Sequence, residues 1–196
     1  MSARPPGVWD WARQAWRNRP PPLDYAWPAL VWMGVLVLAT HGAVFVAVLL
    51  GASAPWVWAA VLARMAGMWE VQRRYFMARF RLLDGRERHT LIICLGHLAA
   101  DAALAVVYGP LSPSAPSRLV LAAYPPLMVV SGLALFISGS TYWGRLIPVG
   151  LAVMALAPVL AWLPEWAPLL YGATGAACMG WYAYCARRYF VPPSTD

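Results

Sequence analysis

Long apolar runs, separated by short polar or turn-rich stretches, are the feature that most constrains how this chain folds. A continuous run of about 20 apolar residues crosses the hydrocarbon core as a helix, at a rise of about 1.5 Å per residue. Lipid cannot hydrogen-bond the backbone, so such a run must be helical. The sequence predicts an all-α, polytopic bundle of six transmembrane helices in three antiparallel hairpins. The predicted spans are about residues 27–50, 55–77, 89–108, 118–138, 146–163 and 167–185.

The composition also indicates a membrane protein. Hydrophobic residues make up 61% of the 196-residue chain and charged residues 12%, whereas a soluble domain has about 45–50% and about 25%. The 12 Trp suit the membrane–water interface. All 15 basic residues are Arg, which excludes a lysine Schiff base. No basic patch falls in a soluble folded segment, so we expect no nucleic-acid partner.

The segment before the first span has its own pattern. Trp9, Ala12 and Trp16 share one face of a helix, and polar residues gather on the other side. This pattern predicts a short amphipathic helix on the cytoplasmic leaflet, and the alternative is a disordered tail. The predicted domains are the interfacial segment 1–25, the membrane domain 26–190 and a cytoplasmic tail at 191–196.

Prolines inside two of the spans predict irregular helices. Pro125-Pro126 lie within the fourth span and Pro158 lies within the fifth. Because proline lacks a backbone donor and clashes with the preceding turn, these residues are expected to kink their helices.

The distribution of arginine predicts the orientation, because positive residues are in excess on the cytoplasmic side of membrane proteins. With six spans, both termini and the second–third and fourth–fifth connections lie on one side and carry 13 Arg, against Arg118 alone on the other. We therefore expect both termini in the cytoplasm, in a bacterial cytoplasmic membrane. The second–third connection is predicted to face anionic lipid headgroups or a protein partner. Its arginines are Arg73, Arg74, Arg79, Arg81, Arg86 and Arg88.

Four ionisable residues inside the predicted spans form a candidate intramembrane polar site: His97, Asp101, Arg64 and His41. Such a residue costs about 2.5–3.5 kcal/mol at the centre of a helix on insertion scales, which makes it a functional candidate by default. His97 and Asp101 are one helical turn apart and can meet. They are interpreted as a proton relay or as a polar clamp between helices. Arg64 pairs with Asp101 or extends to the cytoplasmic interface.

No catalytic residue, metal site or cofactor is predicted. No nucleotide-binding loop or nucleophile motif occurs in a usable context, and the three Cys are isolated in apolar runs. His41 and His97 would be necessary for a bis-histidine haem, but nothing else in the sequence supports one. Small residues recur every four positions in the sixth span, and this stripe predicts close packing against a helix of the same bundle or of a second copy. The stripe consists of Gly172, Ala176 and Gly180.

Several aromatic and Pro/Gly-rich motifs form a more distinctive pattern from the second–third connection onward. They are Arg88-His89, Tyr124-Pro125-Pro126-Leu127, Ser131-Gly132, the Gly139 to Gly144 loop with Tyr142-Trp143-Gly144-Arg145, and Glu165-Trp166-Ala167-Pro168-Leu169. Over about residues 70–190 the chain resembles the C-terminal multi-helix membrane module of planctomycete-type membrane-anchored serine/threonine protein kinases. In that family the kinase domain precedes the membrane module and lies in the cytoplasm, so the resemblance agrees with the predicted orientation. This chain has no kinase Gly-rich loop, His-Arg-Asp or Asp-Phe-Gly motif, so no catalytic residue is carried over.

Two functions follow as hypotheses. The first is a non-enzymatic integral membrane module that anchors, senses or scaffolds for cytoplasmic signalling partners, alone or as a homo-oligomer. The alternative is a small proton- or ion-coupled transporter that uses His97 and Asp101 between proline-broken helices. An intramembrane enzyme would need a nucleophile and a base at the same depth, and the sequence identifies no such pair.

Overall fold

The computed structural model of the protein describes residues 27–77, 85–108 and 117–190. Within these ranges the chain forms helices joined by turns and no β-strand, which confirms the all-α fold class. The elements are α2 (Trp27–Leu49), α3 (Ala54–Tyr75), α4 (Gly85–Tyr108), the 3-10 helix η2 (Ser117–Ala123), α5 (Tyr124–Thr141), α6 (Leu146–Ala155), α7 (Ala157–Trp162), the 3-10 helix η3 (Pro164–Trp166) and α8 (Ala167–Phe190).

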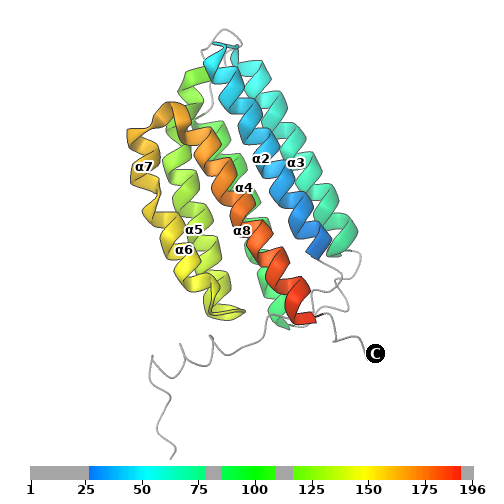
Figure 1. Ribbon diagram of the computed structural model, residues 1–196. Coiled ribbons are helices and arrows are strands. Elements are labelled where there is room, and N and C mark those ends of the chain that lie inside the picture. The colour runs from blue at the N-terminus through cyan, green and yellow to red at the C-terminus, as the bar shows by residue number, and fades with distance from the viewer. Residues whose placement is uncertain (1–26, 78–84, 109–116, 191–196) are drawn as a thin grey trace, which may run out of the picture.

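The helices run up and down a single bundle. α2, α4 and the α6–α7 pair run in one direction, and α3, α5 and α8 run in the other (Figure 1). As a result, the start of α2 and the end of α8 lie at the same end of the bundle, which we call the terminal end. The α5–α6 turn lies there too, while the α2–α3 turn and the turn before α8 lie at the opposite end.

Three helical stretches in the described part of the chain are long and apolar enough to cross a membrane: Trp27–Leu49, Leu91–Tyr108 and Val120–Thr141. The apolar stretch Leu146–Trp162, formed by α6 and α7, is shorter. α3 has the length but carries Arg64 and a charged last turn, which lower its mean hydropathy. By length and composition, these helices support a membrane protein.

Burial in the bundle differs from that in a soluble domain in its buried charges and its apolar surface. Residues that are less than 5% exposed include His41, Arg64 and Asp101, residue types that normally remain in water. Large apolar side chains instead cover the outside, and Trp56 is 70% exposed and Trp162 84% exposed. The rest of the interior is largely apolar, and a few polar side chains turned inwards beneath an apolar surface are typical of a protein in lipid.

Glycines allow two helix pairs to pack at backbone distance. A Cβ on Gly150 of α6 would lie 2.5 Å from the backbone nitrogen of Phe136 and 2.6 Å from the carbonyl oxygen of Gly132, both in α5. A Cβ on Gly172 of α8 would lie 2.9 Å from the Cβ of His41 in α2. The α5–α6 and α2–α8 pairs are the most extensive helix contacts of the bundle.

The kink predicted at Pro125-Pro126 is instead a helix start. The 3-10 helix η2 ends at Ala123, α5 begins at Tyr124, and the prolines occupy its first turn, where the missing backbone donors cost nothing. Pro158 does interrupt the fifth predicted span, since α6 ends at Ala155 and α7 begins at Ala157. Its ring would clash with the carbonyl of residue 154 in a continuous helix.

Several helices extend past the apolar spans predicted for them. α4 begins at Gly85 rather than near residue 89, and α8 continues to Phe190 rather than ending near residue 185. In both cases charged or aromatic residues prolong the helix where the apolar run has already ended. The predicted N-terminal amphipathic helix and the tail at 191–196 lie outside the described residues.

Candidate functional site

The centre of the site is an ion pair between Arg64 of α3 and Asp101 of α4. The Nη2 atom of Arg64 lies 3.0 Å from Oδ2 of Asp101, and the two side chains are 5% and 1% exposed. The pair joins two helices that otherwise pack on different partners, α3 on α2 and α4 on α5. Of the two interpretations of Arg64, the structure therefore shows the pair with Asp101.

His41 of α2 extends the network on the other side of Arg64. Arg64 Nη1 lies 3.2 Å from His41 Nε2, and His41 Nδ1 lies 2.9 Å from the hydroxyl oxygen of Tyr124. Because a guanidinium only donates, Nε2 must accept, so the neutral ring carries its proton on Nδ1 and donates it to Tyr124. Tyr124 and Tyr171 also pack edge-on against the ring, with centroids 5.5 and 4.7 Å away.

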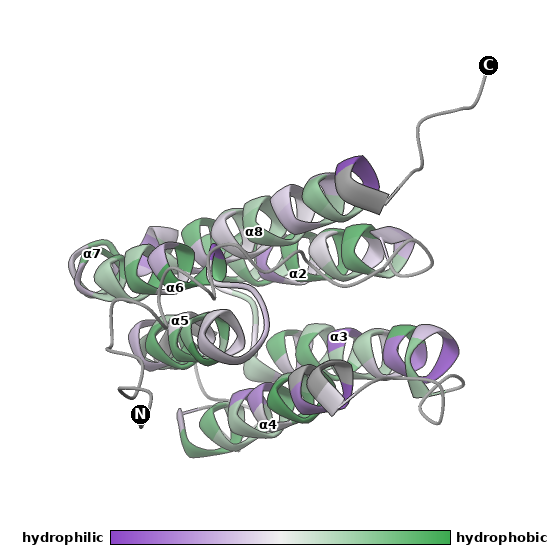
Figure 2. Cartoon of the chain, turned by 90° about the horizontal axis from the view of Figure 1, so that it is seen from below, coloured by the Kyte–Doolittle hydropathy of each residue, from purple (hydrophilic) through white to green (hydrophobic). Residues whose placement is uncertain are grey.

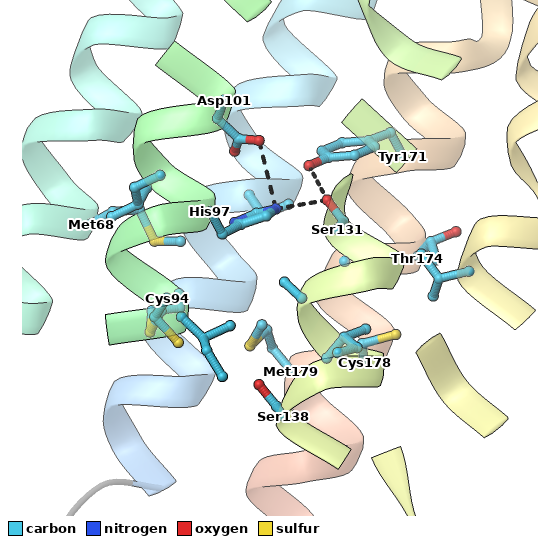
Figure 3. Close-up of a pocket in the computed structure, with 18 of the residues that line it drawn as sticks. Met68, Cys94, His97, Asp101, Ser131, Ser138, Tyr171, Thr174, Cys178 and Met179 are labelled. Carbon is cyan, nitrogen blue, oxygen red and sulfur yellow. Dashed lines mark hydrogen bonds and ion pairs between the residues drawn. The ribbon is translucent and has the colours of Figure 1, made fainter. Parts of the chain in front are cut away.

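His97 of α4 joins Asp101 to a second group of hydroxyls. Its Nε2 lies 2.8 Å from Ser131 Oγ, and Ser131 Oγ lies 2.8 Å from the hydroxyl of Tyr171 (Figure 3). The same Nε2 lies 3.6 Å from Asp101 Oδ1. The contacts thus form one chain of polar groups from Tyr124 through Arg64 and Asp101 to Tyr171, which brings all four predicted residues of the candidate site together.

The serine, histidine and aspartate of this network do not have the geometry of a hydrolase triad. In a triad the carboxylate holds Nδ1 of the histidine and the serine faces Nε2. Here Ser131 and Asp101 approach the same Nε2 atom, and the carboxylate is ion-paired with Arg64. The histidine therefore cannot take a proton from Ser131 while Asp101 orients its other nitrogen.

A cavity of about 120 Å³ lies beside the network and is lined mainly by α3, α4, α5 and α8. His97, Ser131 and Tyr171 meet at one end of the cavity, and Ser138 lines it towards the other end (Figure 3). The remaining lining is almost entirely apolar. Among the described residues, no group of three His, Cys, Asp or Glu side chains could hold a metal ion.

The stripe on α8 divides between two environments. Gly172 and Ala176 face α2, where the Cβ of an alanine at Gly34 would lie 3.5 Å from the carbonyl oxygen of Ala176. A Cβ on Gly180 would meet nothing within 4 Å in the described structure. Two members of the stripe are therefore used inside the bundle, and the third lies on its surface.

The described arginines of the basic connection lie on the surface. Arg73 makes two hydrogen bonds of 2.8 Å to Glu70, and Arg74 lies 3.6 Å from the same carboxylate. Arg88 is exposed at the start of α4. Arg79 and Arg81 lie outside the described residues, as does the side chain of Arg86.

Sequence reasoning missed the uncharged members of the network: Tyr124, Ser131 and Tyr171. Ser131 and His97 are 34 positions apart, so no spacing rule links them. One signal was present, because a hydroxyl in an apolar span needs a hydrogen-bond partner. Pairing each such hydroxyl with each intramembrane ionisable residue would have included the contact with His97.

Comparison of the chain with protein-family models, curated proteins and solved structures found no match.

Proposed function

We propose that the protein is a non-enzymatic membrane module with six spans and both termini in the cytoplasm, which anchors, senses or scaffolds for signalling partners. One observation carries the orientation: described arginines cluster at the terminal end of the bundle (Figure 1). They are Arg73, Arg74, Arg88, Arg145, Arg187 and Arg188. Positive charge concentrated at one end favours the cytoplasmic side for that end.

The interfacial aromatics support the same placement. Arg187 lies 5.5 Å from the ring centre of Trp27, which is partly exposed at the start of α2. Arginine and tryptophan together are typical of the headgroup region. At the opposite end, Trp162 and Trp166 are exposed, and Arg118 in η2 is the one arginine there within the described ranges. The two ends thus differ in charge but share an aromatic border.

Cysteine accessibility tests the topology. In a background in which the three native cysteines are replaced by Ser, Thr141→Cys probes the α5–α6 turn and Glu165→Cys probes the turn before α8. An impermeant maleimide added to intact cells should label Glu165→Cys only, and inverted vesicles should label Thr141→Cys only. The reverse pattern, or labelling of both variants from one side, refutes the orientation.

The partner is proposed to bind the terminal end through its basic surface. The resemblance to kinase membrane modules makes a cytoplasmic serine/threonine kinase the class of partner to test first. Crosslinking in cells followed by purification should recover a cytoplasmic protein, and its yield should fall when Arg73, Arg74 and Arg88 are changed together to Gln. If no partner is recovered and the protein does not self-associate in detergent, the scaffold proposal fails.

A second candidate function is proton- or ion-coupled transport. The observation that favours it is the cavity beside His97 and Asp101, together with the interrupted α6–α7 helix, since broken helices often line substrate sites. Asp101→Asn should then abolish a proton-coupled flux in proteoliposomes. If every measured flux is unchanged by Asp101→Asn, the transport proposal fails.

A further inference from the structure

Buried polar atoms that lack a hydrogen-bond partner gather around the central cavity. Within the described part of the chain they include Nε of Arg64, Oδ1 of Asp101 and Oε1 of Gln72, and all three residues line the cavity. Each of these three residues is at most 4% exposed. An unpartnered polar atom is costly in a low-dielectric interior, so the three atoms together indicate a hydrogen-bonding occupant.

Gln72 differs from the other two residues. Arg64 and Asp101 partly neutralise each other, and Asp101 Oδ1 also has His97 Nε2 at 3.6 Å. Gln72 Oε1 has no hydrogen-bond partner in the described part of the chain. It lies one turn from the end of α3 at Tyr75, near the terminal end and therefore near the membrane surface in the proposed topology.

Between Gln72 and the ion pair the cavity lining is mostly apolar. Met68 follows Arg64 and precedes Gln72 on the same face of α3. Cys94 of α4 lies on the side of Met68, and Met179 and Cys178 of α8 lie across from it, with the hydroxyl of Ser138 beside Met179 (Figure 3). Apolar cavities of about 150 Å³ take up benzene-sized molecules, and this one has a volume of about 120 Å³. The space suits a short alkyl chain or a small ring.

We propose that the cavity binds a small lipid-soluble molecule whose apolar part fills the space lined by Met68 and Cys94 and whose hydroxyl group donates to Gln72 Oε1. This inference rests on the membrane module proposed above. It names the class of ligand that the module would sense, which is an amphiphilic alcohol. The polar group then lies toward the membrane surface and the apolar part toward its centre, as an alcohol is oriented in a bilayer.

The arrangement of helices favours entry from the bilayer. α3 packs on α2 and α4 packs on α5, while α3 and α4 pack on each other far less. In the end-on view α4 lies at the edge of the bundle, on the side opposite to α8 (Figure 2). The seam between α3 and α4 is therefore the weakest wall of the cavity and faces lipid in the proposed topology.

Photolabelling of the full chain in lipid nanodiscs tests the proposal. The probe is a diazirine analogue of 1-hexanol, competed by either 1-hexanol or hexane, and labelled peptides are identified by mass spectrometry. We expect saturable labelling of cavity-lining segments that 1-hexanol suppresses. Cys94→Phe should abolish it by filling the cavity, whereas Ile92→Phe, at a position that is 60% exposed on the same helix, should leave it unchanged.

Gln72→Leu tests the hydroxyl contact separately. The loss of one buried hydrogen bond should weaken competition by 1-hexanol about tenfold and leave competition by hexane unaltered. Thermal melting checks that each variant assembles, and Ala134→Leu narrows the cavity from α5 in case Cys94→Phe does not.

Three results would overturn the proposal: labelling that does not saturate, labelling that is equal in wild type and both cavity-narrowing variants, or equal competition by hexanol and hexane. A cavity that holds only water gives the first of these, with a higher melting temperature for Cys94→Phe. The accessibility of Thr141→Cys and Glu165→Cys tests the membrane placement without touching the cavity. Loss of labelling with intact topology therefore counts against ligand binding alone.

Discussion

Removing one member of the Arg64–Asp101 pair should destabilise the bundle far more than replacing both members with apolar residues. The pair is 3.0 Å long, and its side chains are 5% and 1% exposed. With charge centres about 4 Å apart and an effective dielectric constant of about 20, the attraction is about 4 kcal/mol. Leaving either charge buried alone costs about 3–5 kcal/mol, whereas apolar replacement of both is often neutral or stabilising.

The variants are Arg64→Met, Asp101→Leu and the double variant, compared by reversible unfolding in mixed micelles. Each single variant should lose about 3–5 kcal/mol, and at about 2–4 °C per kcal/mol the melting temperature should fall by about 6–20 °C. The double variant should recover most of this loss. It retains a deficit of about 1 kcal/mol, because His41 Nε2 also loses its contact with Arg64.

Glu70→Gln is the matched control on the same helix. It removes the ion pair with Arg73, whose side chains are 44% and 60% exposed, so water and salt screen it and stability should scarcely change. The argument is refuted if the Arg64→Met and Asp101→Leu losses add in the double variant. It is also refuted if either single variant behaves like Glu70→Gln.

Further variants probe the packing and the uncharged network, each measured by the same unfolding assay. Gly150→Ala should lower stability by about 1–3 kcal/mol, because the new Cβ meets backbone atoms of α5 and α6 must move away. Gly180→Ala, where a Cβ meets nothing within 4 Å, should be neutral or stabilise the protein by up to about 1 kcal/mol. Equal effects of the two variants would contradict the close packing of α5 and α6. Trp143→Ala should cost about 3–5 kcal/mol, since this side chain is 1% exposed and stacks on Trp181, and a loss below about 1 kcal/mol would place it on the surface. Tyr171→Phe should cost about 1 kcal/mol through its lost hydroxyl contact, and no loss would mean that water replaces it.

Periodicity and charge predicted those features of the fold that are set within a single helix. The all-α class follows from the apolar runs, and the break near Pro158 follows from the clash and the missing donor of proline itself. The start of α5 at Tyr124 was harder to foresee, because hydropathy is continuous across η2 and α5 and does not distinguish a 3-10 turn from an α-helix. A proline pair inside an apolar run fits both a kink and a helix start, and only the geometry of the preceding residues separates them.

The charged residues of the candidate site could be predicted from the sequence, but the hydrogen bonds that link them to other helices could not. Asp101 and Arg64 stand out in the sequence because burying either one in lipid is costly. The link from Arg64 to His41 depends on the register of α2 against α3. That register is set by packing such as the approach of Gly67 in α3 to Leu36 in α2. A rotation of α2 by one residue would turn His41 away and leave the hydropathy of the chain unchanged.

The network also explains which helices meet. Apolar surface gives helices no reason to associate in lipid, so packing and polar contacts must select the partners. Five helices each contribute one side chain to the network: His41 from α2, Arg64 from α3, Asp101 from α4, Ser131 from α5 and Tyr171 from α8. Helix α6 instead packs on α5 through the close backbone contact at Gly150.

The structural role of the Arg64–Asp101 ion pair in holding helices together weighs against transport. A coupling carboxylate must gain and lose a proton during each cycle, yet Asp101 is fixed against a permanent cation. Transport would therefore require Arg64 to leave Asp101 for the cavity in every turnover, and α3 and α4 would then lose the ion pair that holds them together. A structural clamp beside the proposed ligand cavity needs no such motion, and it predicts the closed ion pair as the resting arrangement.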